Sequence, residues 1–77
     1  MSNLELEFEA NQLRDVVLFE LRTAVGENRE NLMRARNILW LVGTELSRGD
    51  VPTEKLWDLW QEALDITFHV VLNLYCK

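Results

Sequence analysis

Hydrophobic residues recur at steps of three and four along the first part of the chain. The members of this run are Leu6, Ala10, Leu13, Val17, Leu21 and Ala24. Such spacing places side chains on one face of an α-helix. Gly26 follows the run and suits the left-handed residue that often comes after a helix end. The pattern predicts an amphipathic helix over about residues 6–25.

Upstream of this run, a second pattern competes with the helical one. Leu4, Leu6 and Phe8 alternate with acidic residues over positions 4–9. Period-two alternation is typical of a strand, and the chain contains no second strand-like segment to pair with it. Because strand edges seldom stay unpaired, residues 1–10 are expected to be either helix or frayed tail, or else a strand that pairs with another molecule.

The middle of the chain shows an uninterrupted run at heptad spacing. Its members are Leu32, Ala35, Leu39, Val42 and Leu46. Asn28 is the candidate N-cap before this run, and Gly49 follows Arg48 after it. These signals are typical of a helix start and a helix stop. A second helix is predicted over residues 29–47.

The last third carries two parallel apolar stripes instead of one. The inner stripe is Leu56, Leu59, Ala63, Ile66 and Val70, and the outer stripe is Trp57, Trp60, Leu64, Phe68, Val71 and Tyr75. Thr53 can cap this helix, which is predicted over residues 54–76. A helix in a three-helix domain of this size needs one wide apolar face. The outer stripe therefore predicts contact with a further molecule.

Short connections between the three helices make sequential helices antiparallel neighbours. The expected fold is all-α, either a small three-helix bundle or a helical hairpin with an extra N-terminal helix. A single domain of 77 residues encloses a small core, so a supplement such as oligomerisation is expected. Cys76 is the only cysteine, and it lies about 10 Å along a helix from His69. No intramolecular disulfide, metal site or cofactor is therefore predicted. Self-association as a homodimer is predicted as the supplement to the small core.

Charge narrows the range of partners. The net charge is −5, with acidic outer segments around a mildly basic middle one. Arg29 and Arg36 stand one heptad apart beside the middle seam and are expected to form interhelical salt bridges. The acidic balance and the absence of a groove-reading motif argue against direct binding of nucleic acid. No apolar stretch reaches the roughly 20 residues of a membrane span, and no secretion signal is evident, so a soluble cytoplasmic protein is expected.

Catalytic chemistry finds little support in the residue pattern. A nucleophile, a base and an orienting group must converge in a cleft, whereas His69 and Cys76 lie two helical turns apart. Asp58, Glu62 and Asp65 follow one helical line, but that line is the polar strip of an apolar helix and is expected to face water. The chain is not expected to be an enzyme.

Three tryptophans, Trp40, Trp57 and Trp60, are the most distinctive feature of so short a chain. Tryptophan and tyrosine anchor both cores and interfaces. The candidate partner-binding residues are Trp57, Trp60, Phe68, Tyr75, Trp40, Arg29 and Arg36. The leading hypothesis is a protein–protein interaction module, such as an adapter, a chaperone-like protein or a regulator, that contacts itself and a larger protein. The alternative is an acidic inhibitor that mimics nucleic acid, in a phage- or defence-related role.

Overall fold

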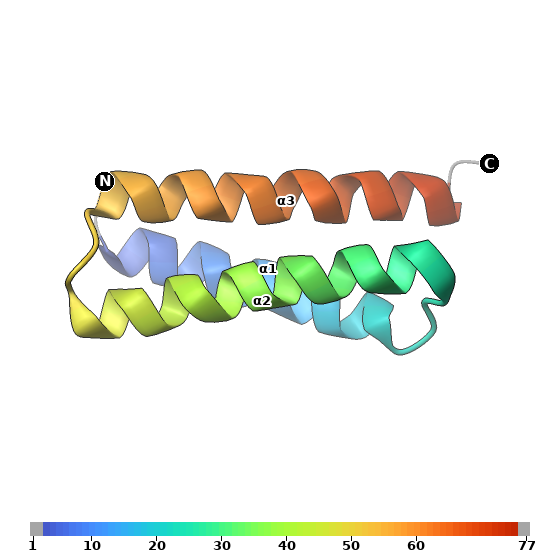
Figure 1. The fold of residues 1–77 in the computed structure, drawn as a ribbon, viewed down its shortest axis with the longest axis horizontal. Coiled ribbons are helices and arrows are strands. Elements are labelled where there is room, and N and C mark those ends of the chain that lie inside the picture. Colours follow the sequence, from blue (N-terminus) through green and yellow to red (C-terminus); the bar gives the residue numbers. More distant parts are fainter. Residues whose placement is uncertain (1–2, 76–77) are drawn as a thin grey trace.

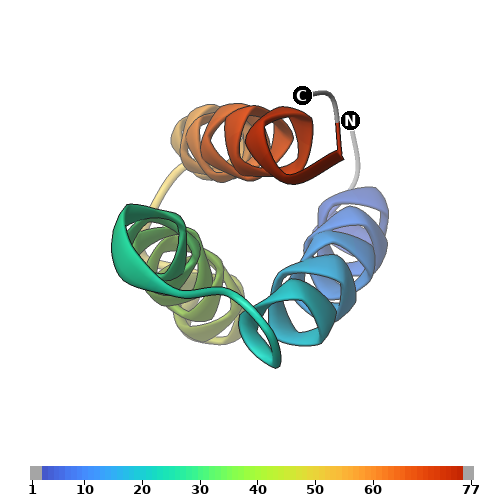
Figure 2. The same cartoon turned by 90° about the vertical axis from the view of Figure 1, so that its right-hand side faces the viewer.

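The computed structural model describes residues 3–75, which form three helices packed as a bundle (Figure 1). The helices are α1 (Asn3–Leu21), α2 (Gly26–Arg48) and α3 (Thr53–Tyr75). Helix α2 runs opposite to the other two, so α1 and α3 run in the same direction. Viewed end-on, the three helices stand at the corners of a triangle (Figure 2). The prediction of an all-α three-helix bundle is confirmed.

Helix α1 already begins at Asn3, so the strand alternative for residues 4–9 is wrong. Leu6 is fully buried together with Ala10 and Leu13, whereas Leu4 and Phe8 are exposed. The helical period of three and four residues therefore determines the structure of this segment, and the period-two alternation does not. Only the helical period places Leu6 in line with the buried residues of the rest of the helix. The predicted end near residue 25 comes earlier in the structure, at Leu21.

The turn after α1 closes through backbone contacts. The amide of Ala24 donates to the carbonyl of Glu20 at 3.1 Å, and Ala24 remains buried although it lies beyond the helix. Helix α2 then begins at Gly26, with Val25 in an extended N-cap conformation that makes no side-chain capping bond. The prediction that Asn28 caps this helix is therefore wrong: the helix has already begun two residues earlier.

Gly49 ends α2 as predicted. Its φ of 75° lies in the left-handed region, and its amide donates to the carbonyl of Glu45 at 2.9 Å. Helix α3 starts at Thr53, whose hydroxyl donates to Oδ1 of Asn3 at 2.6 Å. This bond joins the first residues of α1 and α3, so the two helices start at the same end of the bundle.

The core is made of the residues that the three periodic runs predict. Its buried members are Leu6, Ala10, Leu13, Val17, Ala24, Leu32, Ala35, Leu39, Val42, Leu56, Ala63 and Val70. Helices α2 and α3 share the most extensive interface, and α1 and α3 the least. Across residues 3–75, none of the helices combines the length and the apolar character needed to span a bilayer.

Candidate protein-binding surface

The outer stripe of α3 lies beside α1. Trp57 and Trp60 line a surface hollow together with Leu4 and Phe8 of α1. Farther along, the Tyr75 hydroxyl reaches the carboxylate of Glu20, near the end of α1. The boundary between α1 and α3 therefore follows the outer stripe for most of its length, and α1 covers part of it.

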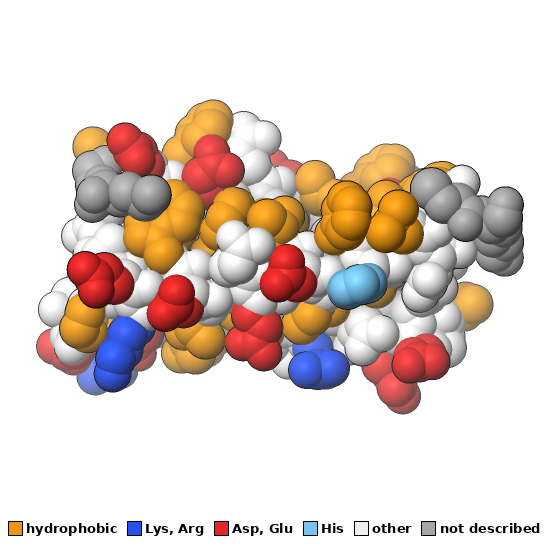
Figure 3. All heavy atoms as spheres, turned by 90° about the horizontal axis from the view of Figure 1, so that it is seen from above, with side chains coloured by type: hydrophobic (Ala, Val, Ile, Leu, Met, Phe, Trp, Pro, Cys, Tyr) orange, Lys and Arg blue, Asp and Glu red, His pale blue; other side chains and the backbone are white. Residues whose placement is uncertain are grey.

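Several large apolar side chains along this boundary remain exposed. Phe8 and Phe68 are each 60% exposed, and Tyr75 is 66% exposed. Phe19 follows Phe8 by three helical turns and shares its side of α1. We call this surface the α1–α3 face and define it by Leu4, Phe8, Phe19, Trp57, Trp60, Phe68, Leu72 and Tyr75. Figure 3 shows apolar side chains gathered beside the row of acidic side chains on α3.

Trp57 and Trp60 form an edge-to-face pair at one end of the α1–α3 face. Their ring centroids are 5.3 Å apart, with an angle of 81° between the ring planes. Both side chains are half-buried and pack against the core. Neither buried indole N–H has a hydrogen-bond partner among the described residues. Because such an unsatisfied donor costs about 1–3 kcal/mol, apolar packing is what holds the pair in place.

Carboxylates surround this end of the face. Glu5 and Glu9 of α1 line the hollow beside the tryptophans, and Glu54 and Asp58 line a second hollow on the other side of the pair. Among the described residues, no lysine or arginine lines either hollow. The tryptophan end of the face is therefore apolar at its centre and negative at its rim.

At the opposite end of the α1–α3 face, Tyr75 of α3 is hydrogen-bonded to Glu20 of α1. Glu20 is buried, and its two carboxylate oxygens accept from the Tyr75 hydroxyl at 3.2 and 3.1 Å. The pKa of Tyr75 is raised above its ordinary value, first by this hydrogen bond, then by the negative charge of Glu20 and by burial. Each of these effects favours the neutral phenol over the phenolate.

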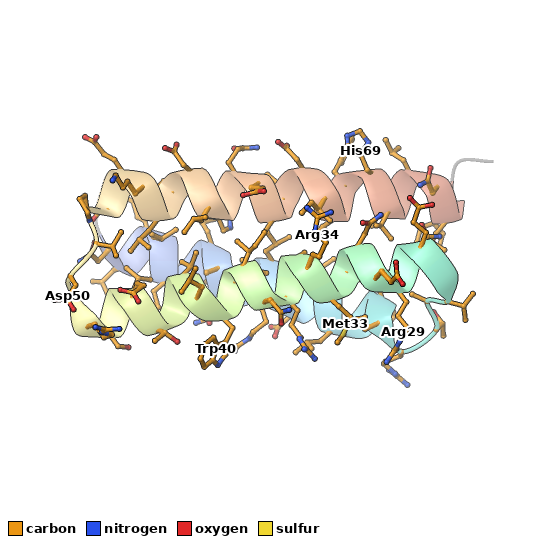
Figure 4. All side chains as sticks on the ribbon, in the orientation of Figure 1. Arg29, Met33, Arg34, Trp40, Asp50 and His69 are labelled. Carbon is orange, nitrogen blue, oxygen red and sulfur yellow. The ribbon has the colours of Figure 1, made fainter. Side chains whose placement is uncertain are left out.

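Trp40, Arg29 and Arg36, also proposed from the sequence as partner-binding residues, lie on a different side of the bundle. Trp40 is 69% exposed and borders a hollow between α1 and α2 with Arg14 and Arg36. Figure 4 shows Trp40 and Arg29 pointing away from α3. The structure thus brings together four of the seven candidates, namely Trp57, Trp60, Phe68 and Tyr75, and separates the other three from them.

The salt bridges expected for Arg29 and Arg36 are not formed within residues 3–75. Arg36 donates instead to Oδ1 of its neighbour Asn37 at 3.3 Å. Arg48 makes ion pairs at the end of α2, with Glu45 at 3.5 Å and with Asp50 at 3.1 Å. Arg29 is exposed and Arg36 is partly exposed, so neither is a fully buried charge that requires an ion-pair partner.

The polar strip of α3 faces outward. Asp58, Glu62 and His69 are exposed, and Asp65 accepts from Nε2 of Gln61 at 3.1 Å. His69 points away from the bundle (Figure 4). Within the described part of the chain, no three His, Cys, Asp or Glu side chains come together as a metal site. Cys76 lies outside the described residues.

Sequence reasoning missed the contribution of α1 to this surface. Leu4 and Phe8 had been noted only as part of a strand-like alternation. Phe19 had not been noted, because it falls between the predicted core positions Val17 and Leu21 and not on either of them. Glu20 was also missed: it stands three residues after Val17 and four before Ala24, in line with the core run, but its charge argued against burial. The available signal was the length of the apolar surface on α1, which exceeds what one core-facing stripe requires.

Together, the fold and the surface define a small three-helix bundle whose α1–α3 face carries exposed apolar side chains and has an acidic rim at one end. Comparisons with protein-family models, with curated proteins and with solved structures give no match to the chain.

Proposed function

We propose that this chain is a protein–protein interaction module that binds its partner through the α1–α3 face. The observation that carries the proposal is the exposure of Phe8 and Phe68, 60% each, on the same side of the bundle as the half-buried tryptophan pair. Scattered single apolar residues are ordinary on a protein surface, whereas a contiguous aromatic patch with a polar rim is typical of an interface.

The packing of the bundle supports this assignment. The interface between α1 and α3 is the least extensive of the three, so side chains that a closer approach would cover remain accessible. A partner helix laid along this boundary would bury Phe8 beside the tryptophan pair and, about 12 Å farther along α3, Phe68. Aromatic anchors of this kind contribute about 2 kcal/mol or more to binding when they sit at the centre of an interface.

The face suits an adapter, a chaperone-like protein or a regulator better than it suits a mimic of nucleic acid. A mimic needs carboxylates spread over a wide surface, whereas here aromatic side chains occupy the middle and carboxylates the rim. A second copy of the chain and a larger protein are the two kinds of partner that the sequence predicts. Either would bind by removing the same apolar area from water.

The proposal is tested by removing the two exposed aromatic side chains. We expect Phe8→Ala/Phe68→Ala to abolish co-purification of the partner from the native source, or self-association in sedimentation, while leaving the thermal unfolding temperature nearly unchanged. The control is Trp40→Ala, which removes a ring that is 69% exposed from the α1–α2 side. Retention of the same partner by the double variant would show that the α1–α3 face is not the binding surface.

A further inference from the structure

We propose that the occupant of the α1–α3 face is an amphipathic helix of another protein whose apolar stripe is flanked by lysine and arginine. This inference rests on the proposed function and specifies the chemistry of the partner. It comes from two separate features of the face: its shape, set by two helices that run in the same direction, and the charge of its rim.

The shape of the face fits a helix. Helices α1 and α3 start at the same end, where Thr53 is hydrogen-bonded to Asn3. Between them, Phe8 and the tryptophan pair line a hollow near the start of both helices. A helix laid along two neighbouring helices completes a four-helix bundle, in which residues at steps of three and four fill the groove. The exposed rings of Phe8 and Phe68 offer such a helix apolar contacts at two positions along the bundle, whereas the Phe19 ring is covered by the guanidinium group of Arg22, 5.8 Å from its centroid.

The rim of the groove selects for positive charge. Glu9 lines the hollow between α1 and α3, and Glu54 and Asp58 line the second hollow, beyond the tryptophan pair on α3. Within residues 3–75, none of these three carboxylates takes part in an ion pair; the ion pairs found there are those of Arg48 with Glu45 and Asp50, at the end of α2. Lysines or arginines flanking the apolar stripe of a docked helix would stand opposite these carboxylates on both sides.

A second copy fits the same face less well. Docking two copies through their α1–α3 faces would bring two sets of rim carboxylates together, on chains that each carry a net charge of −5. Like charges across an interface oppose association and suppress wrong partners. Nucleic acid is disfavoured for the same reason. The charge of the rim therefore favours a cationic helix over both.

The test uses two designed peptides of about 20 residues, a length that supports a stable helix. Both carry the same leucine stripe; lysines flank the stripe in one and glutamates in the other. Binding of each dye-labelled peptide to the full chain is measured by fluorescence anisotropy. We expect the lysine peptide to bind at least about tenfold more tightly, the combined effect of a few exposed ion pairs. Raising the salt concentration should narrow this difference.

Charge variants of the chain assign the effect to the rim. Glu9→Gln/Glu54→Gln/Asp58→Asn should weaken binding of the lysine peptide by about tenfold and leave the glutamate peptide no weaker. The matched control is Glu27→Gln/Glu30→Gln/Glu62→Gln, which removes three exposed carboxylates outside the two hollows. This control changes the net charge equally and should alter the affinity less than about twofold.

Phe8→Ala separates this inference from the proposed function. We expect it to weaken both peptides, because both leucine stripes contact the ring. If both peptides bind equally and both need Phe8, the face docks helices without selecting their charge, and only the present inference is overturned. The inference of a cationic helix is also overturned if the chain forms a dimer that Phe8→Ala dissociates. The same holds if neither peptide binds although Phe8 is needed for binding the native partner. If Phe8→Ala affects neither peptides nor partner, the proposed function fails as well.

Discussion

The hydroxyl of Tyr75 donates to both carboxylate oxygens of Glu20, at 3.2 and 3.1 Å, although the two residues are 55 positions apart in the chain. The contact joins the last described residue of α3 to the last turn of α1. Together with the bond between Thr53 and Asn3 at the other end, it ties the two helices at both ends of their shared boundary. The apolar part of the α1–α3 face lies between these two polar contacts.

The first prediction concerns the ionisation of Tyr75. Its pKa is raised by the hydrogen bond to Glu20 and by the charge of that carboxylate. Since Tyr75 is the only tyrosine, its absorbance change on ionisation can be followed directly. We expect the midpoint to lie above the ordinary value of about 10. Glu20→Gln, which keeps an acceptor but removes the charge, should move the midpoint back toward that value.

The same shift makes stability depend on pH. Because the phenol of Tyr75 loses its proton at a higher pH in the folded state than in the unfolded state, its contribution is fully present below about pH 10 and is lost as the pH rises through the raised pKa. Denaturant unfolding of the wild type and of Tyr75→Phe should therefore converge in this alkaline range. A difference between the two that stays constant through the range would contradict the assignment.

The second prediction tests the core. Leu39 is 3% exposed and lies in the middle of α2, so Leu39→Ala should lower the free energy of unfolding by about 2–5 kcal/mol. The control is Leu41→Ala on the same helix, where the side chain is 41% exposed and the loss should stay below about 1 kcal/mol. Chemical denaturation of both variants measures the difference. Equal losses would mean that the seam of α2 is misassigned.

The third prediction compares two glycines of opposite character. Gly43 lies inside α2, and a Cβ there would meet no atom within 4 Å, so Gly43→Ala should stabilise the fold by about 0.5–1 kcal/mol. Gly49 has a φ of 75° at the C-cap, so Gly49→Ala should destabilise it by about 1 kcal/mol. Thermal unfolding should show shifts of opposite sign. A gain in stability from Gly49→Ala would contradict the assigned role of the left-handed cap.

The fourth prediction concerns the tryptophan pair. With centroids 5.3 Å apart and rings at 81°, Trp57 and Trp60 should be energetically coupled by about 0.5–1.5 kcal/mol. A double-mutant cycle with Trp57→Leu and Trp60→Leu measures this coupling while keeping both positions apolar. The reference pair is Trp57→Leu with Leu39→Ala, which should be additive. Additive losses for the two tryptophans would show that the edge-to-face contact contributes nothing.

The sequence alone determined the number of helices and most of the core. Leu32, Ala35, Leu39 and Val42 are buried as their spacing predicts, because an amphipathic helix in water has one favourable way to turn its apolar side inward. The left-handed stop at Gly49 was equally local, since glycine tolerates a positive φ without a steric penalty. Such features depend only on residues within one or two helical turns. These neighbouring residues can be read directly from the sequence.

Helix starts were less predictable where the chain supplied no strong local signal. Asn28 resembled an N-cap, but α2 begins at Gly26 after an extended Val25 that makes no side-chain cap. Residues 4–9 satisfied two periods at once. The choice between them depended on whether Leu6 could be buried with Ala10 and Leu13 against the rest of the bundle, which is a property of the folded molecule.

The binding surface was decided by the tertiary structure. The sequence showed that α3 carries a second apolar stripe, but not that α1 would lie beside that stripe and add Leu4 and Phe8 to the exposed surface. Nor could it show that Glu20 would meet Tyr75 while Trp40 would stand on another side. The period of a helix determines which of its residues share a side. Which sides meet depends on how the two connections orient whole helices. The long-range contacts that stabilise this orientation, between Thr53 and Asn3 and between Tyr75 and Glu20, form only when the bundle has formed.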